Sequence, residues 1–286
     1  MSEQNGQYDV AIIGGGPAGY VAGIRAQQLG LRSVVIEKQY WGGVCLNVGC
    51  IPTKAMISTI EVLRLARMGA ELGLKGDVEV DYGALMTRKD KVVHQLVTGV
   101  QGLLKANKAD MVFGAARLRG PGEIEVQGDD GGRTIQARNI LLATGSVPAR
   151  PPIPGIDLPG VVDSTGLLTL KEPPKELIII GGGYIGMEFG SIFTNIGTKV
   201  TVIEMLPRIL TLSDEELAKR LQQMLKKDGI DFHLNSKVLA IEEGDEKLSV
   251  RYSENDEEKT VSGDVVLVAV GRTPYTEGLG LEEAGI

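Results

Sequence analysis

The two cysteines of the chain, Cys45 and Cys50, are the residues best suited to chemistry, because paired thiols can form and break a disulfide. Residues five positions apart on a regular α-helix have Cα atoms about 8 to 9 Å apart, whereas a disulfide requires less than about 7 Å. A straight helix therefore cannot carry the bridge, and Gly43 and Gly49 provide freedom to bend. Pro52 suits the first turn of a following helix, whose N-terminus would stabilise a thiolate. The segment favours redox chemistry over the alternative of two small core residues.

Composition and charge limit the classes of protein to which the chain can belong. Its 286 residues, 43% hydrophobic and 23% charged, allow about two globular domains. The net charge of −7 argues against nonspecific binding to nucleic acid or anionic membranes, which requires clustered positive charge. No apolar run approaches the roughly 18 residues of a membrane span, and residues 1–8 lack the apolar core of a signal peptide. We therefore expect a cytoplasmic protein, in which closely spaced cysteines indicate catalysis.

The N-terminal region carries a dinucleotide-binding pattern. A short apolar run at residues 8–14 is typical of a buried parallel strand. Gly14, Gly16 and Gly19 then follow in the spacing G-x-G-x-x-G, before a run compatible with a helix. A second apolar run ends in Glu37. Glycines at this spacing let a pyrophosphate approach the backbone and a helix N-terminus, and the later acid accepts hydrogen bonds from a ribose.

The second half of the chain repeats this pattern. Its glycines and its acid each stand 167 positions after their counterparts, at Gly181, Gly183, Gly186 and Glu204. The repeat predicts two nucleotide-binding βαβ units for two different dinucleotides, with one functional site and a decayed copy as the alternative.

Glu204 favours NAD over NADP, because a carboxylate binds a free 2′-hydroxyl and repels a 2′-phosphate. A 2′-phosphate calls for arginine, and residues 203–207 contain none. Arg208 stands too far along the chain to be the obvious partner.

Periodicity and turn residues outline the remaining elements. Helices are expected at 53–74, 82–105 and 217–227, strands at 111–126, 134–143, 232–241, 247–252 and 265–270, turns at 128–132 and 254–258, and a proline-rich linker at 148–159.

The segment Gly42 to Lys54 resembles the redox-active segment of the dihydrolipoamide dehydrogenases, within the family of flavin-dependent pyridine nucleotide disulfide oxidoreductases. Further landmarks, ending with Gly271 to Pro274, follow in the order of that family. The resemblance implies an α/β fold with two Rossmann-like domains, one for FAD at residues 1–148 and one for NAD at 149–272. Residues 273–286 would begin the return to the flavin domain, and the family's C-terminal dimerisation domain would be absent from this chain.

The resemblance also assigns roles to particular residues. Cys50 would lie against the flavin as a charge-transfer thiolate, and Cys45 would exchange with the substrate disulfide. Lys54 would stabilise reduced flavin, with Glu188 as its ion-pair partner, and Tyr184 would be either an aromatic gate or a packing residue. The expected FAD-binding residues are Gly14, Gly16, Gly19, Glu37, Lys54, Ala116, Thr144 and Gly145. The expected NAD-binding residues are Gly181, Gly183, Ile185, Gly186, Glu188, Glu204, Val238 and Gly271, and no metal site is expected.

The implied activity is the oxidation of protein-bound dihydrolipoamide by NAD, through FAD and the Cys45–Cys50 disulfide. The implied partners are the lipoyl domain of a 2-oxo acid dehydrogenase complex and a second copy of the chain. The family's catalytic His-Glu pair has no counterpart, since neither His94 nor His233 matches its position, and we expect a fragment that is incomplete for turnover. The alternatives are a glutathione reductase-like enzyme, a mercuric reductase, for which further cysteines would be required, and a truncated nucleotide-binding module without lipoamide activity.

Overall fold

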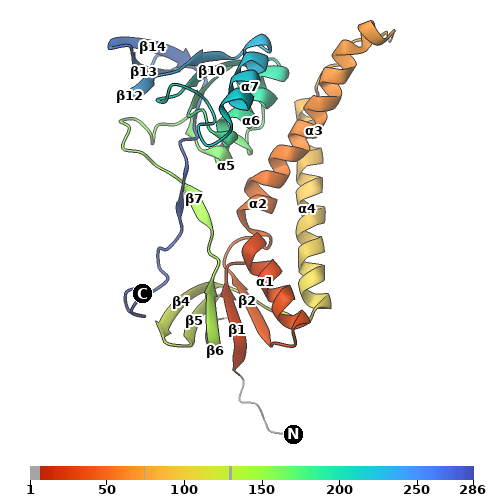
Figure 1. Cartoon of the computed structure of the whole chain (residues 1–286), viewed down its shortest axis with the longest axis vertical. Coiled ribbons are helices and arrows are strands. Elements are labelled where there is room, and N and C mark those ends of the chain that lie inside the picture. The colour runs from red at the N-terminus through yellow and green to blue at the C-terminus, as the bar shows by residue number, and fades with distance from the viewer. Residues whose placement is uncertain (1–6, 74, 129–130) are drawn as a thin grey trace. The chain divides into compact units, whose positions relative to one another are not determined.

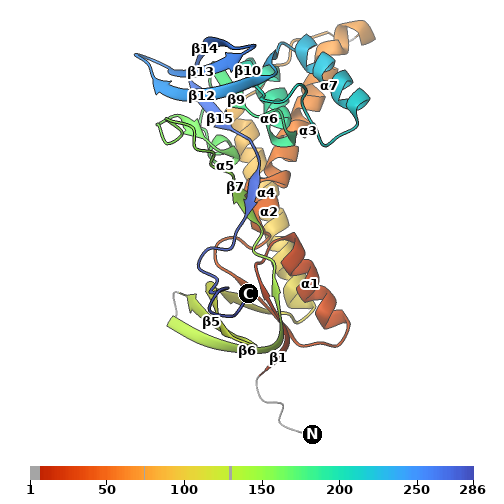
Figure 2. The same ribbon diagram turned by 60° about the vertical axis from the view of Figure 1, so that its left-hand side comes forward.

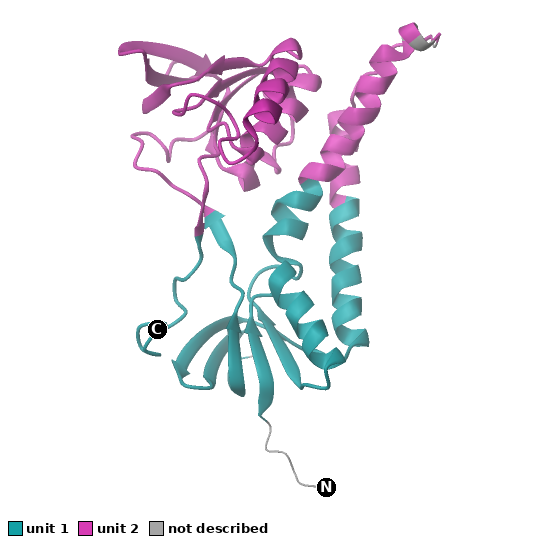
Figure 3. Cartoon of the chain, in the orientation of Figure 1, with its two compact units in different colours: residues 1–52, 91–147, 274–286 teal, residues 53–90, 148–273 magenta. Residues whose placement is uncertain are grey.

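The computed structural model describes residues 7–73, 75–128 and 131–286, which form two compact units (Figure 3). Unit 1 holds the chain up to residue 52 together with 91–147 and 274–286, and unit 2 holds 53–90 and 148–273. The first expected domain boundary, at 148, and the second, at 272, each lie one residue from a division between the units. The polar lead at 1–6, the expected helix end at Leu74 and the centre of the expected turn at 128–132 lie outside the described residues.

Unit 1 contains a six-stranded sheet in the order β3-β2-β1-β6-β5-β4. The first four strands of this order pair in parallel, and β6, β5 and β4 pair antiparallel. The strands are β1 (Tyr8–Ile13), β2 (Ser33–Glu37), β3 (Asp110–Phe113), β4 (Ala115–Gly120), β5 (Glu123–Gly128) and β6 (Gly131–Leu142).

Helices cover the parallel part of this sheet. α1 (Pro17–Gln28) lies against β1 and β2 (Figure 1), and a β-carbon on Gly23 would come within 2.5 Å of Val35. Val100 and Leu104, from α4 (Tyr82–Ala106), pack in one buried cluster with Ile12 and Val35 of the sheet. Because these side chains are excluded from water, their burial is the main stabilisation of this face.

Unit 2 contains a five-stranded parallel sheet in the order β11-β10-β9-β15-β8 and an antiparallel sheet in the order β12-β13-β14. The strands are β8 (Val161–Val162), β9 (Glu176–Ile180), β10 (Lys199–Ile203), β11 (Asp231–His233), β12 (Ser236–Glu243), β13 (Leu248–Glu254), β14 (Glu257–Gly263) and β15 (Val265–Val268). The helices are α5 (Ser164–Leu167), α6 (Tyr184–Asn195) and α7 (Glu215–Lys227), and the short strands β7 (Ser146–Pro148) and β16 (Arg272–Pro274) pair where the chain passes between the units.

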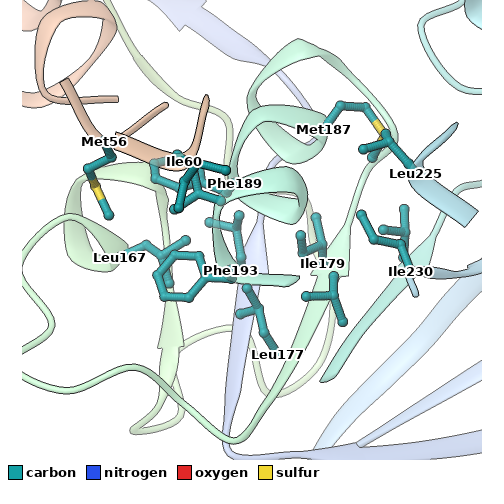
Figure 4. Packing of buried hydrophobic residues seen from close by; sticks show 14 of the residues in the cluster. Met56, Ile60, Leu167, Leu177, Ile179, Met187, Phe189, Phe193, Leu225 and Ile230 are labelled. Carbon is teal, nitrogen blue, oxygen red and sulfur yellow. The ribbon is translucent and has the colours of Figure 1, made fainter. Parts of the chain in front are cut away.

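The parallel sheet of unit 2 is packed on both faces. On one face, Phe189 and Phe193 of α6 join Met56 and Ile60 in a buried cluster that includes Ile179 of β9 (Figure 4). The antiparallel sheet covers the other face (Figure 2), where β9 and β15 share a second buried cluster with β12 and β13. Burial on both faces explains why Leu177 to Ile180 of β9 read as an unbroken apolar run rather than an alternating one. The expected α/β fold with Rossmann-like units is confirmed.

Residues 53–90 belong to unit 2, which differs from the expectation that they would be part of the first domain. They form most of α3 (Cys50–Arg67), the 3₁₀-helix η1 (Met68–Leu72) and the beginning of α4. The reason lies in their apolar side chains, because Met56, Ile60, Leu63 and Leu85 are all buried in the core of unit 2. The sequence periodicity located these helices but carries no information on which sheet they cover.

Two other expectations are corrected in unit 2. The charged turn expected at 254–258 is present at Asn255 and Asp256, which have positive φ in a tight hairpin, but residues 257–263 form the strand β14, which was not expected. The proline-rich segment 148–159 is not a free linker. Ile241 donates its N–H to the carbonyl of Pro154, and Ile153 packs against the cluster under β12.

The segment 43–67 also departs from the expectation that no apolar run approaches membrane-spanning length. By length and composition alone it could cross a membrane, with a mean hydropathy of 1.2 over an 18-residue window. It is interrupted at Gly49, however, and Met56, Ile60 and Leu63 are buried in the core of unit 2. One third of that 18-residue window is buried.

Candidate functional site

The first glycine motif forms a tight turn between β1 and α1. Gly14 has φ +115°, and a β-carbon there would lie 2.2 Å from the carbonyl oxygen of Ala143. A β-carbon on Gly19 would lie 1.7 Å from the carbonyl oxygen of Gly14, so both positions exclude every other residue. Gly16 is the N-cap of α1 and has no side-chain cap, which leaves backbone N–H groups at a helix N-terminus for an anion. The residues present fit the pyrophosphate of a dinucleotide.

Glu37 is almost fully buried and accepts three backbone hydrogen bonds. Its Oε2 accepts from the N–H of Gly15 at 2.7 Å, and its Oε1 accepts from Gln39 at 2.7 Å and Tyr40 at 3.1 Å. The sequence predicted a ribose-binding acid, and the structure adds that this carboxylate fixes the glycine turn to the end of β2. An ionised carboxylate offers about four lone-pair sites, so it can also accept from a ribose hydroxyl.

The second motif repeats this geometry in unit 2. Gly181 has φ +111°, and a β-carbon there would lie 2.5 Å from the carbonyl oxygen of Ala269. Glu204 accepts hydrogen bonds from the N–H groups of Gly182 at 2.5 Å and Leu206 at 2.7 Å. A β-carbon on Gly183 would meet nothing within 4 Å, so the backbone is open to a ligand there. The second motif therefore has the three features of a dinucleotide site: the glycine turn, an acid hydrogen-bonded to that turn, and a helix N-terminus that is open to a ligand.

A cavity of about 820 Å³ lies over this second motif, between the glycine turn and the loop that follows β10. Six of the eight expected NAD-binding residues line it, whereas Gly186 and Glu188 do not. The six are Gly181, Gly183, Ile185, Glu204, Val238 and Gly271. The size and the lining suit a dinucleotide.

Arg208 also lines this cavity, although its place along the chain did not make it the obvious partner of a 2′-phosphate. Its guanidinium donates to the backbone carbonyls of Leu210 at 3.4 Å, Thr211 at 2.9 Å and Ser213 at 3.2 Å. These donors are engaged within its own loop. Spacing along the chain missed Arg208 because the loop after β10 folds back over the cavity.

The cysteine segment forms two short helical pieces. Cys45 lies half-buried in α2 (Gly43–Val48), and Cys50 is exposed as the first residue of α3. Gly49, between them, has φ −145° and ψ −110°, outside helical values, so the expected bend is present. A β-carbon on Gly43, which has φ +62°, would lie 2.5 Å from Cα of Gly16. The segment is thus packed directly on the first glycine turn.

Lys54 and Glu188 form the ion pair that the resemblance implied. Lys54 Nζ lies 2.6 Å from Glu188 Oε1, and both residues belong to unit 2. The pair links α3 to α6, and Glu188 lies in α6 two residues after Gly186. Because the lysine side chain is 56% exposed, the pair adds at most about 1 kcal/mol to stability. The roles of both residues toward a cofactor stay predictions.

The remaining expected FAD residues lie at the edge of unit 1. Ala116 is half-buried in β4, and Thr144 and Gly145 follow β6. Thr144 Oγ1 donates to the carbonyl of Tyr275 at 2.6 Å, and the Tyr275 N–H donates to the carbonyl of Gly145 at 3.0 Å. Lys38 Nζ lies 3.8 Å from the centroid of the Tyr275 ring. Sequence reasoning missed Tyr275, whose only signal was its position after Pro274.

The two histidines lie outside these motifs, in other helices and strands. His94 is in α4, and His233 is in β11, where its Nδ1 lies 3.2 Å from the Tyr252 hydroxyl and 3.3 Å from Glu254 Oε1. Within the described ranges, no group of three or more His, Cys, Asp or Glu side chains is placed to hold a metal ion.

Comparison with known proteins agrees with this geometry. The family of pyridine nucleotide-disulphide oxidoreductases matches residues 8–286. The chain is 44% identical over 288 residues to the mitochondrial dihydrolipoyl dehydrogenase of Dictyostelium discoideum, covering 98% of this chain and 59% of that protein. It is 43% identical to the leghemoglobin reductase of Vigna unguiculata, in a match that covers 97% of this chain and 54% of that protein.

Among solved structures, the Cu(II) complex of the HOCl-induced flavoprotein disulfide reductase RclA from Escherichia coli superposes with a TM-score of 0.85 at 35% identity. That match covers 99% of this chain and 60% of the RclA chain. This chain therefore spans 54 to 60% of the length of these three similar proteins.

Proposed function

Because the chain belongs to the pyridine nucleotide-disulphide oxidoreductase family, whose members use FAD and NAD(H), we propose that it is the FAD- and NAD-binding part of a dihydrolipoyl dehydrogenase. The observation that carries the proposal is the packing of Gly43 on Gly16, which brings the cysteine segment onto the first dinucleotide turn. A dithiol held on a dinucleotide site is the arrangement needed to exchange electron pairs between a thiol substrate and a bound cofactor. Bound FAD and NAD supply the chemistry that carries the electrons onward.

The cysteines perform the substrate half of the reaction. A thiolate of dihydrolipoamide attacks the Cys45–Cys50 disulfide, and its second thiolate then closes the lipoamide disulfide. The substrate loses two electrons and two protons; as the cysteine disulfide breaks, the cysteine sulfurs take the two electrons, and the two protons pass to those sulfurs or to solvent. Cys50 is the exposed first residue of the 18-residue helix α3, so a substrate sulfur can reach it.

The residues of unit 2 bind and orient the nicotinamide dinucleotide. The open backbone at Gly183 leaves room for the pyrophosphate, to which N–H groups at the start of α6 donate. The Glu204 carboxylate accepts a hydrogen bond from the ribose hydroxyl. Lys54, held by Glu188, places a positive charge four residues after Cys50 on the same helix.

The wider context is also part of the proposal. The partner would be the lipoyl domain of a 2-oxo acid dehydrogenase complex, the intact protein would be a homodimer, and its compartment would be the cytoplasm. The homodimer is tested by light scattering on the intact gene product, where a monomeric mass would reject it. Localisation is tested by fractionating cells, where recovery in a membrane or an organelle would reject the cytoplasm.

The central test measures dihydrolipoamide oxidation by the intact gene product with NAD, beside Cys45→Ser and Cys50→Ser variants. We expect each variant to fall to background while NADH binding stays unchanged, because the dinucleotide cavity lies in unit 2 and the cysteines in unit 1. NADP-linked glutathione reduction without lipoamide activity would overturn the proposal.

A second candidate is a flavin disulfide reductase that does not act on lipoyl groups. The similarity to RclA, solved as a Cu(II) complex, supports this candidate. NADH oxidation measured with lipoamide or with Cu(II) as acceptor separates the two. Turnover with Cu(II) and none with lipoamide would favour the second candidate.

A further inference from the structure

The loop between β10 and α7 is built as one wall of the dinucleotide cavity. Ile209 is fully buried, and a β-carbon on Gly182 would lie 3.0 Å from its side chain. Leu210 has φ +48°, and its N–H donates to the carbonyl of Gly182 at 2.9 Å. The loop is therefore fastened to the glycine turn at its base, and its position there does not depend on a bound ligand.

Arg208 holds the outer part of the same loop. One guanidinium nitrogen donates to the carbonyls of Leu210 and Ser213, and the other donates to the carbonyl of Thr211. Only a planar guanidinium presents several donors at fixed angles, so a lysine could not replace all three contacts. The arginine thereby fixes the backbone of Ser213, the last residue before the N-cap of α7 at Asp214.

Tyr184 is joined to this loop through its hydroxyl. It is the first residue of α6, and its side chain lines the cavity although the residue is 56% exposed. Its hydroxyl lies 2.8 Å from Oγ of Ser213, so the two form a hydrogen bond. The equivalent position of the first motif, 167 residues earlier, is Pro17, which suits a first helical turn. A half-exposed tyrosine there is not required to start the helix.

We propose that Ser213 and Arg208 are positioning residues that hold the Tyr184 ring as a preformed wall of the dinucleotide cavity. The proposal rests on the proposed function, because it concerns the site that would take NAD(H). An exposed aromatic side chain otherwise has rotamer freedom, and ordering it when a ligand binds weakens affinity. With the hydroxyl bonded to Ser213, this ordering is complete before the dinucleotide arrives.

A double-mutant cycle tests the proposal. NADH binding is titrated by fluorescence on the full chain, as wild type, Tyr184→Phe, Ser213→Ala and the double variant. Phenylalanine keeps the ring and removes only the hydroxyl. We expect each single variant to raise the Kd for NADH about three- to ten-fold, the range of one hydrogen bond. The double variant should be no weaker than either single variant, because both remove the same bond.

Matched variants separate this effect from a loss of folding. Ser213→Thr keeps the hydroxyl and should restore most of the affinity, whereas Arg208→Lys should weaken binding as Ser213→Ala does. Thr169→Ala serves as the control, because Thr169 donates to the carbonyl of Gly166 in the same unit and does not line the cavity. If Ser213→Ala fails to fold, Tyr184→Phe alone tests the bond.

The outcomes distinguish this proposal from the proposed function. A wild-type chain that binds no NADH would overturn the proposed function of the cavity. A wild-type chain that binds NADH, with single variants of unchanged Kd or with effects that add in the double variant, would overturn the positioning role alone.

Discussion

The two glycine motifs share their backbone geometry and differ in what faces them. A β-carbon on Gly16 would lie 3.6 Å from Cα of Gly43, so the cysteine segment occupies the space beside the first turn. A β-carbon on Gly183 would meet nothing within 4 Å, and a cavity lies beside the second turn. One repeated sequence pattern thus faces the cysteine segment in unit 1 and an open pocket in unit 2.

Two glycines of the second motif should respond differently to alanine. Gly183→Ala should change the free energy of unfolding by no more than about 1 kcal/mol, because the residue is a helix N-cap with open space around it. It should weaken NADH binding, since the new methyl group lies where the pyrophosphate approaches. Thermal unfolding and an NADH titration measure the two effects.

Gly186→Ala provides the matched contrast. Its β-carbon would lie 2.3 Å from the carbonyl oxygen of Gly181, so the turn must shift. We expect a loss of about 1 to 3 kcal/mol of stability. Equal stability of the two variants would contradict this account of the turn.

The helix α3 is divided between the two compact units. Its first three residues, Cys50 to Pro52, belong to unit 1, and the helix from Thr53 onward belongs to unit 2. Arg64 strengthens this attachment, because its guanidinium donates to Asn195 at 3.2 Å and Ser191 at 3.4 Å of α6 and pairs with Asp228 after α7. The helix that begins at Cys50 is therefore anchored beside the helix that begins at the second glycine motif.

The anchoring of α3 by apolar contacts can be measured. Ile60 is 2% exposed in the core of unit 2, so Ile60→Ala should cost about 2 to 5 kcal/mol of stability. Leu65, on the same helix, is 62% exposed, and Leu65→Ala should stay within about 0.5 kcal/mol. Chemical denaturation of both variants checks the prediction, and a small effect of Ile60→Ala would contradict the assignment of this helix to the core of unit 2.

The β13–β14 hairpin should contribute to acid sensitivity. The Lys259 ammonium, which donates a hydrogen bond to Glu254, holds the pKa of that carboxyl below its ordinary value of 4.5, and the hydrogen bond with His233 adds to this effect. Because the folded-state pKa is lowered, the stabilisation is present above pH 4.5 and is lost as the pH falls through the lowered pKa.

The measurement is the melting temperature between pH 6 and pH 3 for wild type and Glu254→Gln. The variant should be less stable at about pH 6 and should lose less stability on acidification. Glu243→Gln, an exposed acid on β12, serves as the control. If the melting temperatures of wild type and Glu254→Gln fall in parallel with pH, the ionisation of Glu254 does not contribute to acid sensitivity.

At the scale of the whole molecule, the chain passes between the units at residues 52–53, 90–91, 147–148 and 273–274. The residues expected to hold FAD lie in unit 1, apart from Lys54, and those expected to hold NAD lie in unit 2. Each dinucleotide therefore has its turn and its acid within one compact unit.

We expect the purified 286-residue chain to retain FAD, because the turn at Gly14, the acid at Glu37 and the end of β6 at Thr144 are assembled within unit 1. The visible absorbance of the purified chain measures retention. Gly183→Ala should leave it unchanged, since that residue lies in unit 2. A colourless protein that takes up no added FAD would contradict this expectation.

By itself, the sequence determined the two nucleotide-binding units and the bent cysteine segment, whereas the pairing of Lys54 with Glu188, 134 residues apart, was implied only by the family resemblance. These features are readable because glycine spacing, strand-end acids and helix-breaking residues act locally along the chain. Strand β14 was missed because polar residues on an exposed hairpin resemble a charged turn.

Only the tertiary structure decided which unit most of α3 belongs to, where Tyr275 attaches, that Arg208 lines the cavity and that Ser213 bonds to Tyr184. Each of these depends on contacts between elements far apart in the sequence or on the path of a loop. Such contacts are selected by the burial of apolar surface and by the satisfaction of backbone hydrogen bonds, and neither leaves a periodic signal in the residues involved.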